Sequence, residues 1–221
     1  MVIGISGKKE SGKDTVCKII QAVDLYYNCP RKTGSWEPRN KFIWDFVRGD
    51  RDVTLSMHRD IESKWERVAY ADKLKEVIAL ITNCSMYALY SHSGKESCSP
   101  IKQPNSERFY TYRELLQLFG SEVGRLISPD LWVDSLFAGY SDQDWIIPDV
   151  RFPNEAKKII DLGGFVIRTE RDGLPQDNHE SETALDGYSE LFSYTIKYDE
   201  TLESMTEDVV KIMVERNLIT L

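Results

Sequence analysis

Short apolar runs alternate with amphipathic segments along most of the chain. The short runs, which have the length and the apolar character of buried strands, lie at 1–6, 65–71, 145–151, 165–168 and 194–198. The segments with apolar residues at every third or fourth position, as in helices, lie at 16–25, 74–81, 115–119 and 201–216. This alternation predicts an α/β fold built on a doubly wound parallel sheet.

Capping residues and helix breakers set the expected limits of these helices. Thr111 and Glu114 have the spacing of a capping box, so a helix is expected to begin just after Thr111. Gly120 is expected to end or bend that helix, and Asp72 is expected to cap the helix that follows it. The polar stretch 91–107 is rich in Ser, Gly, Pro and Asn, which predicts a loop.

Two other segments interrupt the alternation. Residues 28–62 mix proline, glycine, charged and aromatic residues without a sustained period, which indicates an insertion. The apolar residues at 42–47 predict a short packed segment within it, and the insertion is either a flap beside a site or a decorated loop. Residues 171–187 contain almost nothing apolar and are expected to form a surface loop or a small lid. His179 has no partner at metal-ligand spacing, so it is interpreted as a hydrogen-bonding loop residue.

The first apolar run leads directly into a phosphate-loop pattern. The strand at 1–6 is followed by Gly7, four further residues, Gly12 and Lys13, and then by a helix. In this context the loop turns its backbone N–H groups towards a phosphate, and the helix points its positive end at the same place. Lys13 is then expected to reach the β- and γ-phosphates. The pattern predicts a Walker A nucleotide site, and the alternative is that the loop is only a turn.

One position departs from the usual phosphate-loop sequence. Asp14 follows Lys13 at the place where a serine or threonine usually holds Mg²⁺, and Thr15 comes next. A carboxylate can hold a hard cation directly or through water, and the hydroxyl of Thr15 is the other candidate. The departure argues against a switch-type GTPase and favours a kinase of small metabolites.

A second set of candidates lies at the end of the strand at 145–151. Asp149 and Arg151 come at its carboxyl end, where α/β folds place ligand chemistry. In nucleotide-binding proteins of this type, such an acid commonly organises Mg²⁺ or its waters. The other interpretation of Asp149 is a helix N-cap, because Pro153 predicts a helix that begins just after the strand.

Composition narrows the classes of function. The chain has 221 residues, 41% of them hydrophobic and 29% charged, which fits one α/β domain with an insertion or lid. The formal net charge of -8 argues against a non-specific nucleic-acid binder but not against a nucleotide site. No apolar run approaches about 18 residues, so no membrane span is expected. The four cysteines lack C-x-x-C spacing and are expected to be reduced thiols of a cytoplasmic protein.

Several motifs follow one another in order along the chain. They are Gly7–Thr15 (G-K-K-E-S-G-K-D-T), Ala71–Lys75 (A-D-K-L-K), Arg113-x-x-Leu116-Gln117-x-x-Gly120, Trp132, Asp149-Val150-Arg151-x-x-x-Glu155 and His179-x-Ser181-Glu182. Together they resemble the bacteriophage deoxynucleoside monophosphate kinases, over most of the chain except residues 28–60. The G-K-D-T form also occurs in dephospho-coenzyme A kinases and phosphomevalonate kinases, so the arginine-containing motifs are what narrow the resemblance.

The resemblance implies a P-loop NTPase fold of the nucleoside monophosphate kinase type, in a single kinase domain. It implies an acceptor-binding helical region at about 72–140 and a lid at about 171–187. It further implies transfer of the γ-phosphoryl group of ATP to a dNMP, with ATP and Mg²⁺ as cofactors and no nucleic-acid or membrane partner. A homodimer is left open, as is a phage origin, which would place the protein in the host cytoplasm.

The resemblance also implies roles for individual residues. Those implied for catalysis are Lys13, Asp149, Arg151 and the lid cation Arg171. Those implied at the ATP phosphates are Gly7, Ser11, Gly12, Lys13, Asp14 and Thr15. Those implied at the dNMP are Lys9, Arg113, Gly120, Trp132, Asp149, Arg151 and Glu155. The implied metal ligands are Asp14, Thr15 and Asp149, and the choice between Asp14 and Thr15 stays open.

Three other functions remain compatible with the sequence. One is another small-metabolite kinase, such as a kinase of the dephospho-coenzyme A type. The second is a P-loop ATPase coupled to a partner such as nucleic acid, against which the acidic composition counts. The third is a binding module that has lost catalysis, against which the retained Lys13 and Asp149 count. The sequence does not indicate which bases are accepted.

Overall fold

The computed structural model describes residues 1–28, 38–49, 63–174, 179–198 and 201–220. These residues form two compact units. The core unit comprises residues 1–68 and 142–221, and the helical unit comprises residues 69–141.

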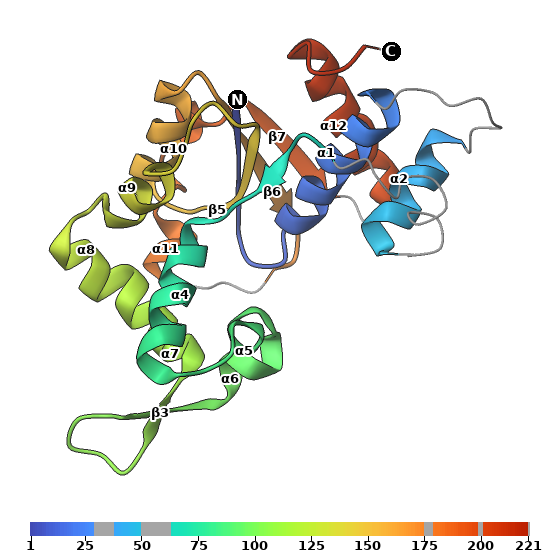
Figure 1. The fold of residues 1–221 in the computed structure, drawn as a ribbon. Coiled ribbons are helices and arrows are strands. Elements are labelled where there is room, and N and C mark those ends of the chain that lie inside the picture. Colours follow the sequence, from blue (N-terminus) through green and yellow to red (C-terminus); the bar gives the residue numbers. More distant parts are fainter. Residues whose placement is uncertain (29–37, 50–62, 175–178, 199–200, 221) are drawn as a thin grey trace. The chain divides into compact units, whose positions relative to one another are not determined.

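A parallel sheet of five strands lies at the centre of the core unit (Figure 1). In spatial order its strands are β2 (Glu66–Arg67), β5 (Trp145–Val150), β1 (Val2–Gly7), β6 (Phe165–Arg171) and β7 (Tyr194–Tyr198). Every neighbouring pair runs parallel. Because β1 lies between β5 and β6, the carboxyl ends of these three strands share one edge of the sheet.

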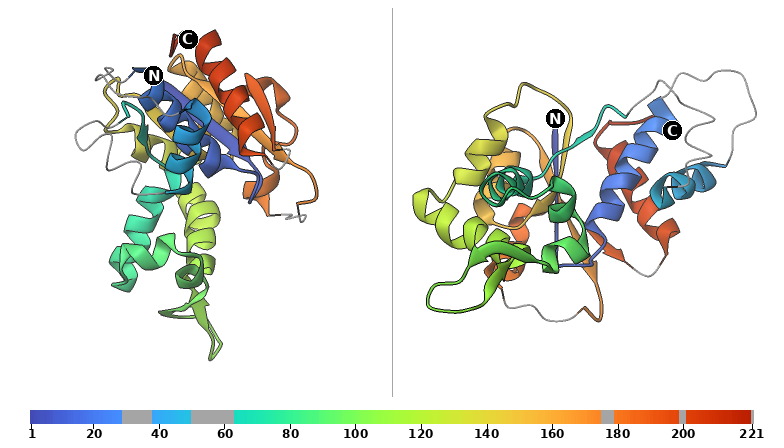
Figure 2. Two further views of the ribbon diagram at one scale, coloured as in Figure 1. Left: turned by 90° about the vertical axis from the view of Figure 1, so that its right-hand side faces the viewer. Right: turned by 60° about the horizontal axis from the view of Figure 1, so that its bottom comes forward.

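Helices cover both faces of this sheet (Figures 1 and 2). One face carries α1 (Lys13–Asn28), α2 (Arg39–Arg48) and α12 (Leu202–Glu215). The other face carries α10 (Pro153–Asp161). The connection from β6 to β7 contains α11 (Glu180–Thr183) and a 3₁₀ turn (Ser189–Leu191). The α/β fold with a doubly wound parallel sheet, predicted from the alternation of apolar patterns, is confirmed.

The described part of the insertion at 28–62 is the helix α2. Phe42 and Ile43 on this helix are buried in the cluster that also contains the apolar face of α1. The predicted packed segment at 42–47 is therefore confirmed. Residues 29–37 and 50–62 lie outside the described residues, so the choice between a flap and a decorated loop stays a prediction.

Short helices and a hairpin make up the helical unit. Its helices are α4 (Tyr70–Thr82), α5 (Met86–Tyr90), α6 (His92–Glu96), α7 (Tyr112–Gln117), a π-helix (Leu118–Val123), α8 (Gly124–Ile127) and α9 (Leu131–Phe137). The antiparallel strands β3 (Cys98–Lys102) and β4 (Phe109–Thr111) form the hairpin, which projects beyond the helices of its own unit (Figure 2). Within the described residues, no helix has the length and apolar character needed to cross a bilayer.

The predicted capping box at the start of α7 is confirmed. The hydroxyl of Thr111 accepts the N–H of Glu114 at 3.2 Å, and the Glu114 carboxylate accepts the N–H of Thr111 at 2.8 Å. This reciprocal pair satisfies two backbone donors that the first turn of a helix leaves without partners.

The expected loop at 91–107 is wrong, because this stretch contains α6 and β3. The hydroxyl of Ser91 accepts the N–H of Gly94 at 3.1 Å and so begins α6. In β3, Ser99 is buried and both of its neighbours in the strand are exposed. A polar residue on the buried side hides the apolar alternation that would otherwise predict a strand.

One limit expected in the helical unit is wrong in part and another is wrong. The helix does not end at Gly120 but continues through it as a π-helix, and a bend at Gly120 stays a prediction. The indole N–H of Trp132 donates to the Gly120 carbonyl at 2.9 Å. Asp72 does not cap α4, which begins at Tyr70. The Asp72 carboxylate accepts from the Lys75 ammonium at 3.0 Å. The strand expected at 65–71 is shorter than predicted, since β2 ends at Arg67 and α4 begins at Tyr70.

The close approach of α10 to β1 generates a prediction about stability. A Cβ added to Gly4 would lie 2.7 Å from Cδ1 of Ile159 and 3.0 Å from Cγ2 of Val150. Gly4→Ala is therefore expected to lower the free energy of unfolding by about 1–3 kcal/mol through overpacking. Ile159→Val removes the clashing methyl group, and urea denaturation should show that the double variant loses less than the two single costs combined. Strictly additive costs would contradict the packing derived for Gly4.

Candidate functional site

The loop between β1 and α1 follows a path that small residues make possible. A Cβ on Gly7 would lie 2.2 Å from Oγ1 of Thr169, and Gly12 has a φ of +95°, a conformation that favours glycine. The Ser11 hydroxyl lies 2.7 Å from the Thr169 hydroxyl in the interior, and the Ser11 N–H donates to the Lys8 carbonyl at 3.2 Å. The loop is thus fastened to β6, and its predicted binding of phosphate stays a prediction.

Lys13 opens α1 and turns back into this loop. Its ammonium donates to the carbonyl oxygen of Gly7 at 2.6 Å and to that of Lys8. Burial, and after it the positive charge of Arg151, lower the pKa of Lys13 to about 8. A bound anion would oppose both effects by favouring the charged form.

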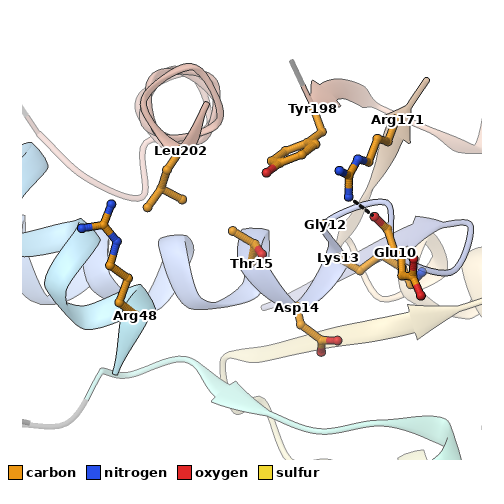
Figure 3. A pocket seen from close by; sticks show the side chains of 9 residues that line it. All are labelled: Glu10, Gly12, Lys13, Asp14, Thr15, Arg48, Arg171, Tyr198 and Leu202. Atoms are coloured by element: carbon orange, nitrogen blue, oxygen red, sulfur yellow. Dashed lines mark hydrogen bonds between the residues drawn. The ribbon is translucent and has the colours of Figure 1, made fainter. Parts of the chain in front are cut away.

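A pocket of about 550 Å³ opens beside the loop (Figure 3). It is lined by Glu10, Gly12, Lys13, Asp14, Thr15, Arg48, Arg171, Tyr198 and Leu202. The volume suits a small-molecule ligand. The structure therefore brings the predicted phosphate-binding residues Gly12–Thr15 together with the predicted cation Arg171.

Arg171 forms one wall of the pocket. Its guanidinium lies 4.7 Å from the centre of the Tyr198 ring and donates to the carbonyl oxygen of Glu10 at 3.4 Å, the dashed line in Figure 3. Arg171 is the last residue of β6. The placement of Arg171 in the loop at 171–187 is therefore wrong by one residue, because the strand extends further than its apolar part.

Arg48 lines the pocket from the last turn of α2, and the sequence analysis missed it. In Figure 3 its side chain extends towards Leu202, with Thr15 lying between it and Arg171. The Lys18 ammonium donates to the carbonyl oxygen of Val47 at 3.1 Å, which ties this end of α2 to α1. The available signal was the position of Arg48 immediately after the apolar run at 42–47.

Oxygen donors for a cation are present near the loop. The Asp14 side chain is 77% exposed and pairs with Arg67 at 3.5 Å, and Thr15 lines the pocket. Among the described residues, no three His, Cys, Asp or Glu side chains come together as a metal site. Mg²⁺ commonly uses one or two protein oxygens together with waters and substrate phosphates. Asp14 and Thr15 fit that pattern, and which of them holds the ion stays a prediction.

Arg151 is held at both ends just beyond β5. Its backbone N–H donates to the Glu155 carboxylate at 2.7 Å, and its Nη1 donates to the Ser181 carbonyl at 3.2 Å and to the Glu182 carboxylate. The Glu182 carboxylate also accepts the N–H of Lys9 at 2.8 Å. Lys9 and Arg151, both predicted at the dNMP, are thereby joined through a residue to which the sequence analysis gave no role.

Glu155 and Asp149 occupy different structural positions near Arg151. The buried Glu155 carboxylate accepts the N–H groups of Arg151 and Phe152, and so caps α10 from within its first turn. Asp149 lies inside β5, and the N-cap of α10 is Phe152. The interpretation of Asp149 as a helix cap is therefore wrong. Its predicted role at Mg²⁺ and the role of Glu155 at the dNMP stay predictions.

Within the predicted lid, residues 171–174 and 179–187 are described, and contacts of the second stretch reach the phosphate loop and Arg151. Asp186 pairs with Lys8 at 3.5 Å and with Arg168 at 3.0 Å. The Nδ1 of His179 accepts the N–H of Ser181 at 3.2 Å, so His179 is a hydrogen-bonding residue as predicted. Closure of this segment over ATP stays a prediction.

Arg113, Gly120 and Trp132 belong to the helical unit. The structure joins Gly120 to Trp132 by the hydrogen bond described above, and Arg113 pairs with the Glu96 carboxylate. Trp132 also lies so close to Gly124 that a Cβ there would be 2.8 Å from the indole ring. The role of these residues in binding a dNMP stays a prediction.

Comparison with known proteins identifies the family. No family model matches the chain. It is 30% identical over 135 residues to a protein of Acanthamoeba polyphaga mimivirus with the provisional name deoxynucleotide monophosphate kinase, an alignment that covers 53% of this chain and 67% of the mimivirus protein. It is 24% identical over 212 residues to the deoxynucleoside-5'-monophosphate kinase of Escherichia phage T5, which covers 84% of this chain and 85% of the phage protein. The chain belongs to the deoxynucleoside monophosphate kinase family. The resemblance carried by the sequence motifs is confirmed.

The lowered pKa of Lys13 predicts the pH dependence of nucleotide binding. The ammonium loses its proton as the pH rises through about 8, and bound phosphates then lose a positive partner. ATP affinity should be level below that pH and fall above it by up to about tenfold per pH unit, as one-proton linkage allows. Titration calorimetry over a series of pH values checks this.

Lys13→Arg is the matched control, because a guanidinium keeps its charge throughout this range. The variant should bind ATP with no loss of affinity through the window in which the wild type weakens. An identical decline in both proteins would show that another group titrates.

The pocket geometry predicts a role for Arg48 in nucleotide affinity. Arg48→Ala removes a cation from the pocket wall, and the expected loss of ATP affinity is roughly fivefold, or about 1 kcal/mol for one exposed charged contact. Lys41→Ala on the same helix removes an exposed cation that is not among the pocket residues, so its affinity should stay unchanged. Equal losses in the two variants would show a long-range charge effect and exclude a local contact of Arg48.

Proposed function

We propose that this protein transfers the γ-phosphoryl group of ATP to a deoxynucleoside monophosphate, yielding the diphosphate and ADP. Family membership supports a nucleotide kinase, and the names of the two relatives support a deoxynucleotide acceptor. The observation that carries the proposal is the placement of the phosphate loop and Arg151 at the ends of the adjacent strands β1 and β5.

In this proposal the pocket beside α1 holds ATP. Gly12, Lys13 and the first turn of α1 receive its phosphates, since N–H donors and the positive end of a helix favour anions. Arg171 and Arg48 add positive charge from opposite walls. Asp14 or Thr15 would hold Mg²⁺, which would supply positive charge beside the phosphates.

Arg151 is proposed to hold the acceptor phosphate. Phosphoryl transfer requires the γ-phosphate of ATP and the acceptor phosphate to lie in line, and the developing charge must be neutralised. It needs no covalent intermediate with the protein. Lys13 is proposed to stabilise the transferring group, since its ammonium is held in the loop by uncharged carbonyl oxygens, for which a charged phosphate can substitute. The helical unit, with Trp132 as a flat apolar face, is proposed to bind the deoxynucleoside.

A coupled assay for ADP release tests the proposal. The acceptor panel contains dAMP, dCMP, dGMP, dTMP, modified dCMPs, the matching ribonucleotides and dephospho-coenzyme A. We expect ADP release that requires ATP, Mg²⁺ and at least one dNMP. Lys13→Ala should lower turnover by about a hundredfold or more, because one donor to the developing charge is lost.

Two results would overturn the proposal. ADP release without any acceptor, stimulated by nucleic acid, would favour a coupled ATPase. Release with dephospho-coenzyme A and none of the dNMPs would favour a different small-metabolite kinase. Circular dichroism of Lys13→Ala controls for loss of the fold.

A further inference from the structure

We propose that Glu182 is a positioning residue that holds Arg151 against the phosphate loop and turns its free edge towards a phosphate. The inference rests on the proposed function, in which that phosphate belongs to the dNMP acceptor. Nothing in the motif His179-x-Ser181-Glu182 by itself indicated this role.

The first argument is the position of the Glu182 carboxylate. It accepts the backbone N–H of Lys9 in the phosphate loop at 2.8 Å and pairs with Nη1 of Arg151 after β5. Its side chain is only 7% exposed. A carboxylate so far removed from water is stable only with partners of this kind. Glu182 therefore joins three segments that are far apart in the sequence: the loop after β1, the end of β5, and α11.

The second argument is the division of the donors of Arg151. Its Nη1 donates to both the Ser181 carbonyl and the Glu182 carboxylate. Within the part of the chain that the structure describes, Nε and Nη2 make no hydrogen bond, and the side chain is 31% exposed. A guanidinium edge with parallel N–H groups fits two phosphate oxygens. The Ser181 carbonyl and the Glu182 carboxylate thus occupy one nitrogen of Arg151 and leave its other donors available.

The third argument is the way in which the turn that carries Ser181 and Glu182 is itself held in place. The Nδ1 of His179 accepts the N–H of Ser181 and lies 2.8 Å from the Ser181 hydroxyl, which sets the first turn of α11. Leu185 is buried just beyond this helix. The turn therefore presents the Ser181 carbonyl and the Glu182 carboxylate to the same nitrogen of Arg151.

These contacts have a thermodynamic consequence for acceptor binding. An unrestrained arginine samples many rotamers, and ordering it on binding would weaken affinity. With the backbone N–H held by Glu155 and the guanidinium held by Glu182, Arg151 is ordered before the acceptor arrives. Removing the charge of Glu182 should therefore impair use of the dNMP more than use of ATP.

The test is Glu182→Gln, which preserves the shape and an oxygen for the Lys9 N–H but removes the charge that holds Arg151. We expect KM for the dNMP to rise about tenfold to a hundredfold, as for loss of a charged hydrogen bond. Measured well below pH 8, where Lys13 keeps its proton, the Kd for ATP should stay within about twofold, since the pocket residues are untouched. Glu180→Gln, an exposed acid on the same short helix, is the matched control and should behave as the wild type.

A double variant shows whether Glu182 acts through Arg151. Adding Glu182→Gln to Arg151→Met should change KM for the dNMP no further, because the residue to be positioned is already missing. A further rise in KM would mean that Glu182 acts on the fold in general, and so would overturn the inference. An unchanged KM in Glu182→Gln alone would do the same.

A measurement without turnover separates this inference from the proposed function. Relaxation of the Nε–H of Arg151 by NMR, assigned with Arg151→Lys, should show an ordered side chain in the wild type and in Glu180→Gln. The order parameter should fall below about 0.6 in Glu182→Gln. If no dNMP is phosphorylated, the proposed function fails and this measurement still decides the inference. An Arg151 equally ordered in Glu182→Gln would overturn it.

Discussion

Parallel hydrogen bonding of β1 to both β5 and β6 is the constraint on which the candidate site depends. The pairing sets Ser6 opposite Val150 on one side and opposite Arg168 on the other. Because parallel strands end at the same edge, the phosphate loop and Arg151 leave the sheet together. The side chains of Ile3 and Ile5 in β1 pack against α1 and α12 in the core, so packing in the core holds the edge of the sheet in place.

Charge at that edge is balanced locally in a protein with a net charge of -8. Arg151 and Arg168 are each paired on one side, with Glu182 and Asp186 respectively. Both acids come from the segment that follows β6. Because they are paired in this way, the arginines can stay close to the Lys13 ammonium. The positive charge of Arg151 lowers the pKa of Lys13, and the negative charge of Glu182 raises it. An acidic composition is therefore compatible with an anion-binding edge, since only neighbouring charges act strongly.

Sequence reasoning recovered the sheet, the order of strand, loop and helix in β1 and α1, and the helix α12, because each depends on a local pattern. Lys13 and Gly12 follow from spacing and Thr111 from a capping box, so these features need no knowledge of tertiary contacts. Arg48 and Glu182 could not be assigned roles in the same way. Their roles depend on contacts between segments that are distant in the sequence. Glu182 and Lys9, for example, are more than a hundred residues apart, and no periodic pattern in the sequence predicts such a contact. The hairpin at β3 was missed because a buried serine takes an apolar position in it.

The helical unit enters and leaves the core unit at one place. The N–H of Glu66 in β2 donates to the Asp144 carbonyl at 2.8 Å, and that of Val68 donates to the Ile146 carbonyl at 3.1 Å. The chain thus departs after Val68 and returns at Asp142 beside the segment that it left. A short linker could therefore join Val68 to Asp142 in place of the helical unit at little cost in chain entropy. A segment attached in this way can be exchanged or lengthened during evolution while the strands of the core unit and the loop after β1 keep their geometry.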